Sequence, residues 1–126
     1  MKRFLIIALG GALGAIARYG LANLIGAKLR TEFPLGTWLV NVSGSFIIGA
    51  FLTIFNEIGT LHPDLRLLIA VGFVGAYTTF STFEFETLQL LQSGRPLLAI
   101  LYVSSSVTIG LLAVWGGAAL ARRLLI

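Results

Sequence analysis

The chain has 126 residues, of which 57% are hydrophobic and 11% charged, and its mean hydropathy is +0.96. It is too short for two domains and too apolar for an ordinary soluble surface, so a lipid bilayer is the expected solvent. The net charge of +4 is weak evidence for nucleic-acid binding, which we do not expect, because basic residues commonly flank membrane spans. The absence of cysteine excludes disulfides, and a lone histidine, His62, cannot build a metal site.

Four apolar stretches approach the roughly 20 residues that a helix needs to cross the hydrocarbon core of a membrane. The expected spans cover residues 4–27, 35–56, 67–92 and 97–121 of a single domain, 1–126. Short polar turns separate the spans, and the second and fourth carry no charged residue. We therefore expect an all-α integral membrane protein with four transmembrane helices.

The first span begins with basic residues before an apolar run, a pattern that can be mistaken for a signal peptide. Its removal would leave three spans, so we expect a retained helix. Gly10 and Gly14 here, and Ser45 and Gly49 in the second span, have the four-residue spacing that lets helices approach closely. This spacing fits packing within one subunit or contact between two subunits.

The basic residues are spread over both sides of the predicted bundle. An even number of spans places both termini and the middle loop on one side. That side carries Lys2, Arg3, Arg66, Arg122 and Arg123. The other side carries Lys28, Arg30 and Arg95. So small a bias permits insertion in both directions, and a homodimer is attractive where such a small bundle must form a pore.

Polar residues of the second span share one helical face, because Thr37, Asn41 and Ser45 are spaced by four. An asparagine amide at this depth can donate two hydrogen bonds, to an anion or to a neighbouring helix. The residues alone leave both roles open.

The third span is dense in glycine and hydroxyl residues between positions 72 and 83, which predicts a broken helix. A broken helix frees backbone carbonyls and amides, and such points in membrane proteins commonly bind ions. Phe80 and Phe83 project from nearly the same face. Such rings usually pack, but a phenyl edge carries partial positive charge and can face an anion without binding it tightly.

The fourth span places Tyr102, Ser106 and Gly110 at four-residue steps, so one face carries hydroxyls. These form a polar track or bond to carbonyls of their own helix. Arg18 lies inside the first span and is a functional candidate, although a long side chain can also reach the membrane surface. Glu86 raises the same question near the end of the third span.

Three blocks of sequence, one in each of the first three spans, resemble the signature motifs of the Fluc (CrcB) family of fluoride channels. They are GGALGAIARY at 10–19, GTWLVN at 36–41 with Gly44, and GFVGAYTTFSTF at 72–83. The last block is highly specific, and the likeness extends over all four spans. The resemblance implies an antiparallel, dual-topology homodimer in the bacterial inner membrane, with two narrow fluoride pathways and no catalysis.

Residue roles follow from the same resemblance by motif match. The implied fluoride pathway comprises Asn41, Phe80, Phe83, Ser81, Thr82, Tyr102 and Ser106. Arg18 would lend positive potential near a vestibule. A structural sodium ion would lie at the centre of the dimer, held by backbone carbonyls of Gly75 and Thr78 from both subunits. The helix break would then lie at Gly75 to Thr78, a stretch without an acid that could neutralise a divalent ion.

Two positions depart from the family pattern. Gly110 stands where a further hydroxyl is expected on the fourth helix, and Glu84 adds an acid close to Glu86. The main alternative function is a small dual-topology multidrug exporter, which couples transport to protons through a membrane-embedded acid. The first span holds no acid, and Glu86 is the only substitute. A non-transporting assembly subunit is the other alternative.

Overall fold

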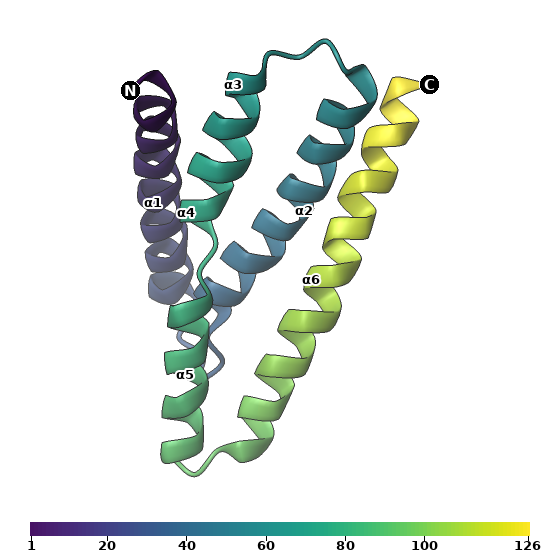
Figure 1. Cartoon of the computed structure of the whole chain (residues 1–126). Coiled ribbons are helices and arrows are strands. Elements are labelled where there is room, and N and C mark those ends of the chain that lie inside the picture. Colours follow the sequence, from purple (N-terminus) through teal and green to yellow (C-terminus); the bar gives the residue numbers. More distant parts are fainter.

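The computed structural model describes residues 1–126 as a bundle of four long helical segments (Figure 1). The first, second and fourth are α1 (Lys2–Lys28), α2 (Leu35–Ile58) and α6 (Pro96–Leu125). The third is divided into α3 (Pro63–Leu65), η1 (Arg66–Val74), α4 (Gly75–Tyr77) and α5 (Phe80–Gln92). All four segments are long and apolar enough to cross a membrane, which confirms the expected four-span, all-α fold.

The segments run up and down the bundle, so both termini lie at the same end (Figure 1). Proline residues begin two of the helices, and glycine residues end two of them. Pro34 and Pro96 stand at the starts of α2 and α6, where the missing N–H costs no helical hydrogen bond. Gly59 and Gly94 follow α2 and α5 with φ of 64° and 73°, a left-handed conformation that favours glycine.

Glycine allows the helices to approach closely within the subunit. α1 packs along η1 and α4, while α2 packs most extensively along α6. A Cβ on Gly14 would collide with the carbonyl of Phe73, and one on Gly49 would collide with the carbonyl of Val114. Gly10 meets the third segment in the same way. The glycines whose role the sequence left open therefore serve internal packing in this structure.

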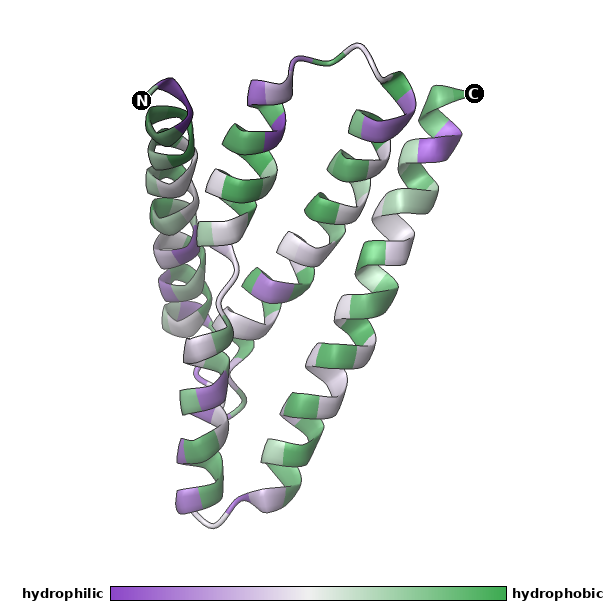
Figure 2. Cartoon of the chain, viewed as in Figure 1, coloured by the Kyte–Doolittle hydropathy of each residue, from purple (hydrophilic) through white to green (hydrophobic).

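Only 17 of the 126 residues are buried within the single chain, so most of the apolar surface faces outward. Figure 2 shows hydrophobic residues along most of each long segment, with hydrophilic residues gathered toward the ends and a few at intermediate depth. This is the pattern of a bundle whose surroundings are lipid or another subunit.

The third segment is broken, as expected, but the break lies later than Gly75. Gly75 is helical, whereas Thr78 and Thr79 have extended backbones with ψ of 154° and 121°. The helix resumes at Phe80. Before the break, η1 has the wider turns of a π-helix, a geometry that is rare and frequent at functional sites.

Candidate functional site

The break in the third segment is held by the side chain of Asn41 from α2. Its Nδ2 donates to the carbonyl of Thr79 at 2.9 Å, and its Oδ1 accepts from the N–H of Thr79 at 2.8 Å. The amide thus supplies both partners that the extended backbone loses by leaving the helix. One Nδ2 hydrogen remains for another acceptor, because a primary amide carries two.

The two sides of the break have different backbone chemistry. On the C-terminal side of the break, Thr79 caps α5, because its Oγ1 accepts from the N–H of Thr82 at 3.3 Å. On the N-terminal side, where α4 ends, the N–H of Thr79 donates to Asn41 rather than to a carbonyl one turn earlier. The carbonyls of α4, from Gly75 to Tyr77, and that of Thr78 after it therefore lie at a helix end, where carbonyls lack the usual helical partner.

Gly75 and Thr78 lie along an open hollow of about 290 Å³ between α2 and the third segment. Asn41 and Ser45 line the same hollow from α2, so every polar side chain in it is uncharged. No cluster of three acidic or histidine side chains occurs anywhere in the chain. A setting without acidic side chains fits a monovalent cation better than a divalent one.

Phe80 and Phe83 follow the break and differ sharply in burial. Their ring centres are 5.9 Å apart, but 73% of Phe80 is exposed, whereas Phe83 is buried with 8% exposed. Phe83 contacts the ring of Tyr102 on α6 at a centroid distance of 5.0 Å. The structure therefore brings Phe80, Phe83 and Tyr102 into one aromatic row that ends on the outer surface of the subunit.

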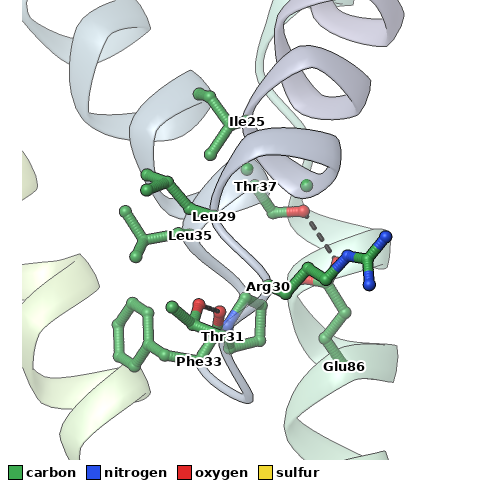
Figure 3. Close-up of a pocket in the computed structure, with 11 residues that line it drawn as sticks. Ile25, Leu29, Arg30, Thr31, Phe33, Leu35, Thr37 and Glu86 are labelled. Atoms are coloured by element: carbon green, nitrogen blue, oxygen red, sulfur yellow. Dashed lines mark hydrogen bonds between the residues drawn. The ribbon is translucent and has the colours of Figure 1, made fainter.

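A carboxylate lies beside this aromatic row. Glu86 Oε1 accepts from the hydroxyl of Thr37 at 2.8 Å, and Oε2 accepts from the hydroxyl of Tyr102 at 2.7 Å. Figure 3 shows Glu86 reaching from α5 toward Thr37, at a pocket of about 220 Å³ that Arg30 also lines. Both carboxylate oxygens are thus hydrogen-bonded by neutral donors, and a cationic side chain lies at the same pocket.

The turn between α1 and α2 closes over Tyr102. Phe33 packs edge-on against its ring at 5.3 Å and also contacts Trp38, whose Nε1 donates to Ser105 at 3.1 Å. Tyr102 is fully buried in the resulting cluster. Its hydroxyl is therefore fixed in direction by packing as well as by the bond to Glu86.

Further along α6, the expected hydroxyl track is only partly visible within one subunit. The Oγ of Ser106 is buried without a hydrogen-bond partner. Gly110 lacks a hydroxyl, but Ser45 of α2 places its Oγ 3.6 Å from where a Cβ of Gly110 would lie. A hydroxyl from the neighbouring helix therefore lies beside the position that we expected to be missing from the track.

Of the remaining site candidates, Arg18 lies apart from this centre, whereas Ser81 and Thr82 adjoin the break. Arg18 is half-buried on α1, roughly 15 Å along the helix axis from Lys28, and makes no ion pair in the chain. Ser81 is exposed beside Phe80, and Thr82 accepts a hydrogen bond from the hydroxyl of Thr79 at 3.0 Å. Glu84 is exposed and without a partner.

Sequence reasoning undervalued Glu86 and Thr37. It placed Glu86 near a helix end as an open question and Thr37 on a polar face without a partner. The hydrogen bonds that join them connect residues 49 positions apart in the chain, and Tyr102 joins from a third helix. One signal was present, because Glu86 is an ionisable residue inside a predicted span.

Four membrane-length segments, a helix broken at intermediate depth and polar groups gathered around the break define a small multi-pass membrane protein with an intramembrane polar site. A family model described as "CrcB-like protein, Camphor Resistance (CrcB)" matches residues 5–118. The chain belongs to this CrcB family.

Curated relatives are similar over nearly their full length. The chain is 50% identical over 122 residues to the fluoride-specific ion channel FluC of Acidobacterium capsulatum, which covers 97% of this chain and 98% of the relative. It is 48% identical over 121 residues to the protein of the same name from Solibacter usitatus, covering 96% and 99%. A FluC of Thermus thermophilus is 48% identical over 111 residues, covering 88% of each chain.

Proposed function

We propose that this chain is a fluoride-specific ion channel that lets fluoride leave the cell passively and so lowers its cytoplasmic concentration. The observation that carries the proposal is the 50% identity, over 97% of the chain, to a relative named as such a channel. The relatives are transport proteins rather than enzymes, in agreement with the expectation of no catalysis. The bacterial sources of these relatives support a place in the bacterial inner membrane.

The chemistry of the site supports an anion pathway. Fluoride is small and strongly hydrated, so a pore must replace its water hydrogen bonds without a cation that would trap it. The unused amide hydrogen of Asn41, the hydroxyls of Ser81 and Thr82, and the ring edges of Phe80 and Phe83 meet this condition. Tyr102 and Ser106 extend the hydroxyl groups along α6, and Arg18 supplies positive potential nearer the membrane surface.

The alternative of a proton-coupled multidrug exporter receives no support. Its required acid would be Glu86, but the relatives that match the whole chain are named as fluoride channels. In the proposed channel, Thr37 and Tyr102 hydrogen-bond to the Glu86 carboxylate, which reduces its repulsion of a passing anion.

The function is tested with purified protein in liposomes loaded with potassium fluoride. A fluoride electrode records efflux after valinomycin is added to dissipate the charge, and parallel liposomes are loaded with chloride. We expect fast fluoride efflux, little chloride efflux and no requirement for a proton gradient. Efflux of fluoride no faster than from protein-free liposomes would refute the proposal.

We further propose that the working unit is an antiparallel homodimer. Within one chain the aromatic row ends on the surface, with most of Phe80 exposed and Ser81 exposed beside it. A surface of lipid would leave these groups without the polar surroundings that an ion needs. A second subunit is the occupant that would complete the pathway, and the near balance of basic residues suits two opposite orientations.

The dimer and its dual topology give one prediction. Because the chain has no cysteine, Leu124→Cys and Ser93→Cys introduce single labels at opposite ends of the bundle. A membrane-impermeant maleimide should label both variants from outside and, after permeabilisation, label more of each. The purified protein should have twice the 13.5 kDa chain mass by light scattering. Labelling of only one variant from outside would contradict the dual topology.

We also propose a structural sodium ion at the centre of the dimer, coordinated by backbone carbonyls of Gly75 and Thr78. The released carbonyls at the end of α4 and the acid-free hollow beside them support it. An ion bound there would neutralise carbonyl dipoles that otherwise lack partners. The hydroxyl of Thr78 is not needed, since it already donates to the carbonyl of Val74 at 3.0 Å.

The sodium proposal predicts a salt-specific stability. Thermal unfolding of the purified dimer should occur at a higher temperature in sodium chloride than in choline chloride of equal ionic strength. Sodium at roughly ten times its dissociation constant would add about 1.4 kcal/mol of stability. The variant Thr78→Ala should keep this sodium-dependent difference because it keeps the carbonyl. Equal unfolding temperatures in the two salts would exclude the site.

A further inference from the structure

A second contact between α2 and the broken helix lies on the N-terminal side of the break, at the end of α4. Tyr77 is the last residue of α4 and is buried, with 6% exposed. Its hydroxyl lies 2.8 Å from Oγ of Ser43 on α2, and its ring stacks on Phe73 at 5.6 Å with an angle of 11° between the planes. Neither the proposed ion pathway nor the proposed sodium site uses Tyr77 or Ser43.

The direction of this hydrogen bond follows from counting protons. A serine hydroxyl has one hydrogen, and Oγ of Ser43 lies 2.6 Å from the carbonyl of Leu39, one turn earlier in α2. Ser43 therefore donates to Leu39 and accepts from Tyr77. Tyr77 is the donor, so removing its hydroxyl removes the bond while Ser43 keeps its own.

The two contacts with α2 flank Thr78 on both sides. Asn41 binds the backbone of Thr79, and Ser43 binds the side chain of Tyr77. Between them, Thr78 packs on Gly44, where an added Cβ would collide with the Thr78 methyl group. One turn of α2 thus holds three consecutive residues of the break, two by hydrogen bonds and one by close packing.

We propose that Tyr77 and Ser43 are a positioning pair that fixes the break for ion conduction. The proposal rests on the proposed channel function. The pair stops the last turn of α4 from rotating about its axis, and so fixes the direction of the carbonyl that follows it. Because α5 begins directly after the extended residues, the same constraint fixes the direction in which Phe80 leaves the break.

Tyr77→Phe isolates this role because it keeps the ring and its stacking on Phe73. A net hydrogen bond of about 1 kcal/mol corresponds to roughly a fivefold change, so we expect fluoride efflux to fall about fivefold. Hydrogen exchange at the Thr79 amide should rise by a similar factor, because its bond to Asn41 opens more often. The unfolding temperature should fall only slightly, and the dimer should stay intact on size exclusion.

The experiment compares Tyr77→Phe, Ser43→Ala and the double variant in liposomes. Exchange is followed by mass spectrometry on a peptide that contains Thr78 and Thr79. Tyr19→Phe and Ser104→Ala are matched controls, since Tyr19 is 73% exposed and Ser104 bonds only to carbonyls of its own helix. If the pair acts as a unit, the double variant should equal either single variant in efflux and in exchange.

Two results would overturn the inference. Additive losses in the double variant would mean that the two side chains act independently. Unchanged exchange at Thr79 in Tyr77→Phe would mean that the pair does not hold the break, whatever the efflux. The exchange measurement needs no fluoride, so it tests the pair even if the wild-type protein proves not to conduct fluoride.

Discussion

Asn41→Asp is expected to reduce fluoride efflux to the rate of protein-free liposomes. The carboxylate would place a negative charge on the proposed anion route. It would also present an oxygen to the carbonyl oxygen of Thr79, where the amide now donates at 2.9 Å. A backbone carbonyl left without its partner at this depth costs about 1–3 kcal/mol, so the break should also become less stable.

Asn56→Asp is the matched control for this change. Asn56 is exposed near the end of α2, and its side chain makes no hydrogen bond, so the same chemical substitution should leave efflux near the wild-type rate. Each variant is first checked for an intact dimer by size exclusion. Wild-type efflux from a well-folded Asn41→Asp dimer would remove Asn41 from the pathway.

Phe80→Ile is expected to slow fluoride efflux by up to about tenfold while leaving the unfolding temperature almost unchanged. Phe80 is 73% exposed in the single subunit, so its replacement disturbs little packing inside that subunit. What is lost is the positive ring edge, whose contacts are worth up to about 1.5 kcal/mol, or roughly a factor of ten in rate. Liposome efflux and thermal unfolding are measured on the same preparation.

Two further phenylalanines of α5 serve as comparisons for Phe80. Phe85 is 60% exposed and contacts no other aromatic ring, so Phe85→Ile should conduct like the wild type. Phe83 is buried against Tyr102, so Phe83→Ile should lower both efflux and stability, the latter by about 1.5 kcal/mol or less. Equal efflux in Phe80→Ile and Phe85→Ile would show that the ring at position 80 has no special role.

Hydropathy was sufficient to predict the four spans, because each membrane-crossing helix must satisfy its own backbone and expose apolar side chains. The broken helix was also predictable from its glycine and hydroxyl residues, but where the break starts was not: Thr78, the last residue of the expected break, is extended, whereas Gly75 is helical. The structure leaves Gly75 helical because the N–H of Thr79 is the first to find a better acceptor, Oδ1 of Asn41, on another helix. The sequence around the break does not show which acceptor this N–H will bind, because the competing acceptor lies on another helix.

The polar partners of the site were the least predictable part. Asn41 was expected to face an ion or a helix, and in this structure one of its two donors and its acceptor are engaged by Thr79. The bond between Thr37 and Glu86 and the bond between Ser43 and Tyr77 depend on which helix faces lie together. Periodicity assigns a residue to a face of its own helix, but not to a partner on another helix.

The common end of the two termini determines how two copies of this bundle can be joined in one polypeptide (Figure 1). A short linker from Ile126 of one copy to Met1 of the next has both of its ends on the same side of the membrane. The two joined copies are then parallel. An antiparallel pair in one chain needs a further crossing between the copies, a stretch of roughly 20 apolar residues. In a fusion of two copies of this protein, whether the linker crosses the membrane therefore decides whether the copies are parallel or antiparallel.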